Sequence, residues 1–198
     1  GNEDPLLHAT LAPMGIRVHT WWGPFIIREN RARQLIKVGS DKDLPFVRNE
    51  KGDIINFPPE YKELHDRNPH VDFFHPRATE LIKADLNNRF NLGVAGSMVD
   101  FADIIQDESV FYNGKKGDEM HNIYCLEYDH VLYNIYKERR GDDHVLYSRA
   151  AFTGSQAYLC QFAGDHQSNF YGLTAAIKGN LSISMVGFSN IGCCVGGY

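Results

Sequence analysis

Segments with a helical repeat of apolar residues alternate along this chain with short apolar runs that have the length of β-strands. The repeat predicts helices over 6–14, 76–92, 118–140 and 169–178. The short runs predict strands over 16–22, 94–101, 144–149, 157–162 and 183–191. This order of elements is typical of one α/β unit with right-handed crossovers and a parallel sheet.

The segment 39–70 interrupts the alternation. Residues 46–55 alternate in polarity around a turn at Gly52, as a small hairpin does, and a proline-rich stretch follows them. We therefore interpret 39–70 as an insertion loop within a single domain that spans 1–198.

Composition excludes two classes of partner. A net charge of −5, without a large basic cluster, disfavours nucleic acid. No run reaches the roughly 18 uninterrupted apolar residues of a membrane span, and the first residues lack the features of a signal peptide.

Four cysteines without a C-x-x-C pair favour a reducing compartment, so we expect a cytoplasmic location.

Charged residues follow three of the predicted strands. Asp100, Arg149 and Asp165 lie at or just beyond the carboxyl ends of successive strands, and no G-x-G-x-x-G motif follows any strand. Enzymes of the (β/α)₈ class carry their chemistry at this end of the strands. About five strands in 198 residues, with an insertion, predict part of such a TIM barrel.

Each of these three residues also has a structural interpretation. Asp100 could cap its strand or form a salt bridge, Asp165 could be the N-cap of the next helix, and Arg149 could form a structural ion pair. Two carboxylates and an arginine at neighbouring strand ends are more informative together, because glycoside hydrolysis needs paired carboxylates across the scissile bond.

The histidines suggest a different class of enzyme, a metal-dependent barrel hydrolase. His65, His70 and His75 are spaced by five residues, which does not repeat on one helix face, and no H-x-x-x-H or Cys/His quartet occurs. The absence of G-x-S-x-G disfavours a serine hydrolase. We therefore expect no metal.

Ordered motifs extend over nearly the whole chain. They are MGIRVHTWWGP at 14–24, VDFFHP at 71–76, GVAGSMVDF at 93–101, MHNxY at 120–124, SRAAFTGSQ at 148–156, FAGD at 162–165 and GCCVGGY at 192–198. Together they resemble glycoside hydrolase family 31, the retaining α-glycosidases that include α-glucosidases, α-xylosidases and sulfoquinovosidases. The resemblance implies a (β/α)₈ barrel, of which this chain is about strands 3 to 7, and it places the remaining strands and accessory β-domains in a parent chain.

The resemblance also implies a mechanism. Asp100 matches the family's nucleophile, Asp165 matches its general acid/base, and Arg149 matches a residue that contacts the sugar. The expected activity is cleavage of a terminal α-linked sugar by double displacement through a glycosyl-enzyme intermediate, which needs no metal or organic cofactor. We expect residues 1–198 alone to be inactive.

The same resemblance implies that Phe162, Trp22 and Cys194 bind substrate, and two of these residues depart from the family's pattern. Phe162 replaces the usual Trp, and Cys194 replaces an Asp that lines the sugar site, while Ala95 and Asp103 replace an Asp and a Glu. A thiol cannot accept the same charge-assisted hydrogen bonds as a carboxylate. The alternative is therefore a catalytically impaired, carbohydrate-binding relative of the same family.

Overall fold

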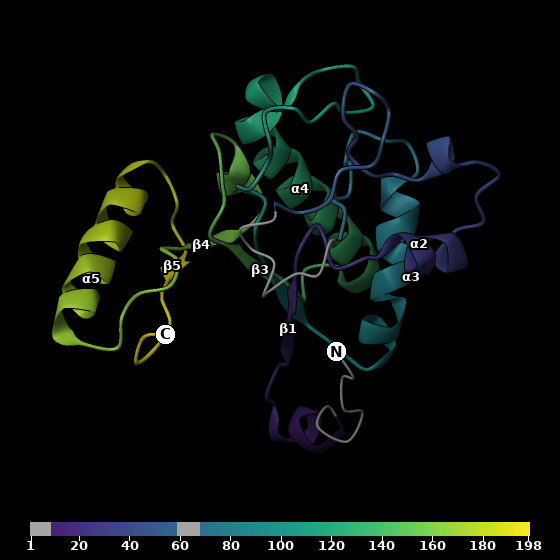
Figure 1. The fold of residues 1–198 in the computed structure, drawn as a ribbon. Helices are drawn as coiled ribbons and strands as arrows, with labels where there is room; N and C mark the ends of the chain where they lie inside the picture. Colours follow the sequence, from purple (N-terminus) through teal and green to yellow (C-terminus); the bar gives the residue numbers. More distant parts are fainter. Residues whose placement is uncertain (1–8, 59–67) are drawn as a thin grey trace.

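The computed structural model describes residues 9–58 and 68–198 (Figure 1). Five strands form one sheet, and each strand pairs in parallel with the next one along the chain. The strands are β1 (His19–Trp22), β2 (Gly96–Val99), β3 (Val145–Ser148), β4 (Cys160–Phe162) and β5 (Ile191–Gly192). The predicted α/β fold with a parallel sheet is confirmed.

Helices connect the strands. They are α2 (Glu29–Leu35), α3 (Ala78–Asn91), α4 (Gly117–Arg140) and α5 (Phe170–Met185), with short 3₁₀ turns η1 (Ala12–Met14), η2 (Asp41–Asp43) and η4 (Ser155–Ala157). In Figure 1, α3 and α4 lie together beside the first strands, whereas α5 lies at the other end of the sheet, next to β5. No helix of the described ranges is both long enough and apolar enough to span a membrane.

The two-residue period of the strands divides their side chains between two faces. Thr20 and Ser97 are paired in register, and their hydroxyl oxygens are 3.5 Å apart. The Ser97 hydroxyl is also 2.6 Å from the hydroxyl of Tyr136 on α4, so this face of the sheet meets the helices. Trp21 and Met98, which pair with each other one residue further on, therefore lie on the opposite face.

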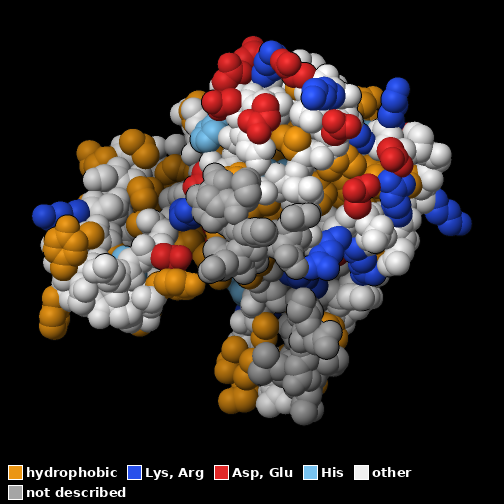
Figure 2. Space-filling model, viewed as in Figure 1, with side chains coloured by type: hydrophobic (Ala, Val, Ile, Leu, Met, Phe, Trp, Pro, Cys, Tyr) orange, Lys and Arg blue, Asp and Glu red, His pale blue; other side chains and the backbone are white. Residues whose placement is uncertain are grey.

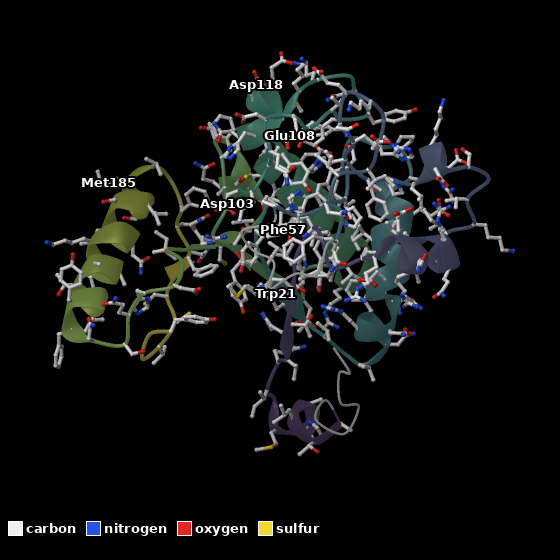
Figure 3. The ribbon with its side chains drawn as sticks, viewed as in Figure 1. Trp21, Phe57, Asp103, Glu108, Asp118 and Met185 are labelled. Atoms are coloured by element: carbon white, nitrogen blue, oxygen red, sulfur yellow. The ribbon has the colours of Figure 1, made fainter. Side chains whose placement is uncertain are left out.

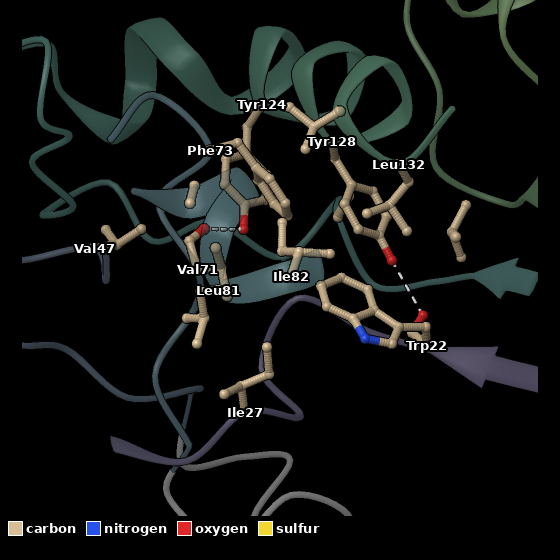
Figure 4. Packing of buried hydrophobic residues seen from close by; sticks show 14 of the residues in the cluster. Trp22, Ile27, Val47, Val71, Phe73, Leu81, Ile82, Tyr124, Tyr128 and Leu132 are labelled. Carbon is tan, nitrogen blue, oxygen red and sulfur yellow. Dashed lines mark hydrogen bonds between the residues drawn. The ribbon is translucent and has the colours of Figure 1, made fainter. Parts of the chain in front are cut away.

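The core fills the space between the sheet and helices α3 and α4 (Figure 4). Tyr124, Tyr128 and Leu132 of α4 are fully buried there with Leu81 of α3 and Trp22 of β1. The Trp22 and Tyr128 rings stack with their centroids 5.7 Å apart. Each such side chain contributes about 1.5–3 kcal/mol by leaving water, so this layer fixes the strand ends that carry the charged residues.

The last predicted strand, 183–191, is wrong over most of its length. Helix α5 continues to Met185, and β5 contains only Ile191–Gly192. Gly172 and Ala176 are buried on the inner side of α5, while larger apolar side chains cover its outer side (Figure 2). An apolar run of this length fits a helix as well as a strand, and periodicity alone could not decide between them.

Other boundaries agree with the predicted elements to within a few residues. The first predicted helix ends with the 3₁₀ turn η1 and is closed by Gly15, whose φ is +74°. Its first residues, 6–8, lie outside the described residues, as do 59–67 of the insertion. Helix α2, in the polar stretch before the insertion, was not predicted.

The described part of the insertion is tied to the rest of the domain by isolated bridges. Arg48 pairs antiparallel with Ile54 around the predicted turn, and Gly52 has a φ of +87° there. Arg48 also pairs with Val110, and Phe46 pairs with Val71. The predicted hairpin is thus confirmed as a single bridged turn.

Candidate active site

Asp100 follows β2 directly and is almost completely buried, with 7% of its surface exposed. Its two carboxyl oxygens have different partners. Oδ1 accepts a hydrogen bond from the backbone N–H of Phe101 at 2.8 Å, and Oδ2 accepts one from the indole N–H of Trp21 at 3.1 Å. A buried carboxyl without such donors would be costly, and these two bonds also fix its orientation.

Phe101 has a left-handed backbone, with a φ of +63°, and it is the single non-glycine residue with positive φ among the described residues. A bulky side chain in this region costs about 1–3 kcal/mol and persists when the surroundings hold it there. The Phe101 ring packs edge-on against Phe25 and Trp21, at centroid distances of 5.5 and 6.1 Å. Phe57 from the insertion completes this aromatic cluster, at 5.9 Å from Phe101.

Arg149 follows β3 and connects two carboxylates. Its Nε is 3.3 Å from Oδ1 of Asp100, and one of its terminal nitrogens is 3.0 Å from Oδ1 of Asp103. The guanidinium also lies over the Phe101 ring, 5.2 Å from the centroid. A third of the Arg149 side chain is exposed, so the structural ion pair is present and the group still reaches the surface.

Asp165 lies in the loop between β4 and α5, and its side chain is exposed. The N-cap of α5 is Asn169, whose side chain accepts a hydrogen bond from Gly172 N at 2.7 Å, so the N-cap interpretation of Asp165 is wrong. The preceding residue, Gly164, packs against Arg149: a Cβ at position 164 would lie 3.0 Å from Cδ of that arginine. The loop thus brings Gly164, the residue before Asp165, against the arginine that binds Asp100.

Trp22, expected to bind substrate, lies in the hydrophobic core with no exposed surface. Its indole N–H is directed at Asp85 of α3, 3.3 Å away. The neighbouring Trp21 takes the position beside Asp100 instead, because adjacent residues of a strand point to opposite faces. Trp21 was missed because its face follows from its pairing with Met98, two residues before Asp100, and only the structure gives that register. Figure 3 shows Trp21 with Phe57 and Asp103 near the middle of the molecule.

Phe162 and Cys194 line a hollow of about 610 Å³ on the face of the sheet opposite the helices, and Met98, which pairs with Trp21, also lines it. The lining includes Tyr147, whose ring meets Phe162 edge-on at 6.2 Å. Burial raises the pKa of Tyr147, and the nearby Cys194 raises it further. Neither Asp100 nor Asp165 lines this hollow.

The histidines of the described ranges do not gather into a ligand set. His75 accepts a hydrogen bond from Arg77 N at 3.1 Å, and His70 packs edge-on against Phe57 at 5.1 Å. His65 lies outside the described residues. Across 9–58 and 68–198, no three His, Cys, Asp or Glu side chains are grouped closely enough to hold a metal ion.

Comparisons with known proteins find relatives along almost the whole chain. The chain is 25% identical over 193 residues to an alpha-xylosidase of Emericella nidulans, and this match covers 96% of the chain and 24% of that protein. It is 27% identical over 186 residues to alpha-xylosidase XylQ of Lactiplantibacillus pentosus, covering 93% and 23%. The chain therefore spans about a quarter of the length of these relatives.

The fold is similar to that of one part of a cycloalternan-forming enzyme from Listeria monocytogenes, solved in complex with a pentasaccharide substrate. The TM-score is 0.85 at 20% sequence identity, over 98% of this chain and 19% of that one. The five-stranded sheet is thus part of a TIM barrel, as predicted. The family model of the "Glycosyl hydrolases family 31 TIM-barrel domain" matches residues 3–198, so the chain belongs to glycosyl hydrolase family 31.

Proposed function

We propose that the protein containing this chain hydrolyses a terminal α-glycosidic bond with retention of configuration. In the first step Asp165 donates a proton to the leaving oxygen while a carboxylate oxygen of Asp100 bonds to the anomeric carbon. In the second step Asp165 removes a proton from water, which displaces Asp100 and releases the sugar. No group outside the substrate and water is consumed.

The observation that carries this proposal is the environment of Asp100. The carboxyl follows a strand in the part of a family 31 barrel where barrel enzymes carry their chemistry, and Trp21 and the Phe101 N–H orient it. Arg149 sits on the same carboxyl, and its aliphatic stem packs on Gly164. This contact brings the loop that carries Asp165 against the arginine that binds Asp100, and retaining hydrolysis requires the two carboxyls to lie roughly 5–5.5 Å apart in the complete active site.

The test is covalent trapping in the full-length protein. We would treat it with 5-fluoro-α-glycosyl fluorides of the gluco, xylo and galacto series and locate the added mass by peptide mass spectrometry. The expected label is on Asp100. A label on another carboxylate would overturn the assignment of the nucleophile.

Two variants separate the roles of the aspartates. Asp100→Asn should take no label. Asp165→Asn should still be labelled, because fluoride leaves without strong acid assistance, but it should lose turnover of glycosides with poor leaving groups. A folded wild-type protein that takes no label from any sugar would instead favour the carbohydrate-binding relative without activity, which Cys194 and Ala95 motivate.

A further inference from the structure

Helix α4 presents three fully buried tyrosines whose hydroxyls bond to different parts of the domain. Tyr124 donates to the carbonyl oxygen of Val71 at 2.8 Å, and the Tyr136 hydroxyl is 2.6 Å from that of Ser97 in the middle of β2. Tyr128 lies between them, and its hydroxyl is 3.1 Å from the carbonyl oxygen of Trp22 and 3.4 Å from that of Asp100. One helix therefore contacts the backbone of the candidate nucleophile itself.

The carbonyl that Tyr128 contacts belongs to the peptide that joins Asp100 to Phe101. The N–H of that same peptide donates to Oδ1 of Asp100 at 2.8 Å. The C=O and the N–H lie in one rigid peptide plane and point in opposite directions, so rotation of this peptide would break both hydrogen bonds together. The orientation of the peptide is also the one that gives Phe101 its positive φ, which a phenylalanine adopts only under constraint.

We propose that Tyr128 is a positioning residue for Asp100. Its hydroxyl holds the Asp100–Phe101 peptide in the strained orientation, and the N–H of that peptide then holds the carboxylate towards the anomeric carbon. This inference rests on the proposed function, because it assigns a nucleophile to be positioned. The single proton of the Tyr128 hydroxyl is shared between two carbonyls. The nearer one, of Trp22, also accepts from Asp100 N at 3.0 Å, so loss of the hydroxyl affects the Asp100 carbonyl more.

The test compares Tyr128→Phe with Tyr136→Phe in the full-length protein. Each variant removes one buried hydroxyl from the same helix and leaves the ring in place. We expect Tyr128→Phe to lower the rate of covalent labelling at saturating 5-fluoroglycosyl fluoride by about tenfold, with the half-saturating concentration changed less than about twofold. Tyr136→Phe should leave that rate unchanged, although it should lower the thermal midpoint by about as much as Tyr128→Phe does.

Crystal structures of the two variants provide a readout that needs no activity. Loss of the Phe101 N to Asp100 Oδ1 contact in Tyr128→Phe, and its retention in Tyr136→Phe, is the expected result. An unmoved peptide and carboxyl in Tyr128→Phe, or equal labelling rates in the two variants, would overturn the positioning role. A wild-type protein that takes no label would overturn the proposed function instead, and the crystal structures would then decide the role of Tyr128 alone.

Discussion

The indole nitrogen of Trp21 lies 3.1 Å from Oδ2 of Asp100, on the face of β1 that looks away from the helices. The next residue, Trp22, has the same ring but points into the core, where its indole N–H meets Asp85. The two neighbouring tryptophans thus lie on opposite faces of the strand, and Trp21 is 37% exposed whereas Trp22 is fully buried. Substitution of Trp21 should therefore affect the reaction, whereas the same substitution of Trp22 should affect stability.

Trp21→Phe is expected to slow labelling of Asp100 by about tenfold, because it removes a donor from a buried carboxyl and keeps an aromatic ring in place. Trp22→Phe is the matched control. It leaves a cavity in the core and removes the donor to the half-buried Asp85, so it should lower the thermal midpoint while the labelling rate of the folded protein stays within about twofold. Labelling kinetics and thermal unfolding of both variants would check this, and equal rates for Trp21→Phe and wild type would contradict it.

Gly164 provides a second test of how the loops meet. Alanine at this position would strain a backbone with a φ of +88° and bring its Cβ within 3.0 Å of Cδ of Arg149. We expect Gly164→Ala to displace Arg149 and to reduce kcat/KM on α-glycosides by at least about tenfold.

Gly187→Ala is the control for the backbone strain alone. Gly187 has a φ of +95°, and a Cβ there would meet only the flexible Gln156 side chain, at 3.9 Å. Both variants should lose about 1 kcal/mol of stability, but only Gly164→Ala should lose activity. Steady-state kinetics that fall equally in both variants would rule out a specific role for the contact with Arg149.

The sequence predicted the order of strands and the position of Asp100 and Arg149 at their ends, because apolar runs and strand-end charges are local patterns. It could not assign the faces of Trp21 and Trp22, because the face depends on the register between strands that are far apart in the chain. The contact of Tyr128 with Trp22 shows the same limit, since it joins residues 106 positions apart. No local pattern distinguishes that tyrosine from the others on α4.

Two buried carboxyls outside the strand ends, Asp72 and Asp129, are expected to make the stability of the domain depend on pH. Burial raises the pKa of Asp72 to about 6 and raises the pKa of Asp129 well above its usual range, although hydrogen bonds to each act in the other direction. The folded state therefore holds these protons more tightly than the unfolded chain does. Their contribution to stability is greatest below about pH 4, and it is lost as the pH rises through the folded-state values, for Asp72 between about pH 4 and 6.

Asp129→Asn is expected to flatten the pH dependence of the thermal midpoint from about pH 4 upward, because an amide does not titrate. The amide oxygen can still accept the hydrogen bond from the Ser155 hydroxyl, which lies 2.7 Å from Oδ2 of Asp129. Asp72→Asn should also remove its own titration but lower the midpoint at every pH. Both Asp72 oxygens accept backbone N–H groups, from Phe74 at 3.0 Å and from Tyr112 at 2.6 Å. An asparagine has one oxygen in place of two, and its amide nitrogen cannot accept, so one of these two hydrogen bonds is lost. An Asp129→Asn midpoint that follows the wild-type curve over this pH range would contradict the account.

Cys194 stands where the family pattern has an aspartate, and it lies near Tyr147 in the hollow beside β5. A thiol is a weak hydrogen-bond acceptor, whereas a carboxylate can accept from two sugar hydroxyls at once, at about 1.5–3 kcal/mol for each charge-assisted bond. Cys194→Asp is therefore expected to raise kcat/KM on at least one of a panel of α-glucosides, α-xylosides and α-galactosides by about tenfold or more. Cys193→Asp, which places the same charge one residue earlier, should not. Unchanged turnover of every glycoside by Cys194→Asp would show that this position does not select the sugar in this protein.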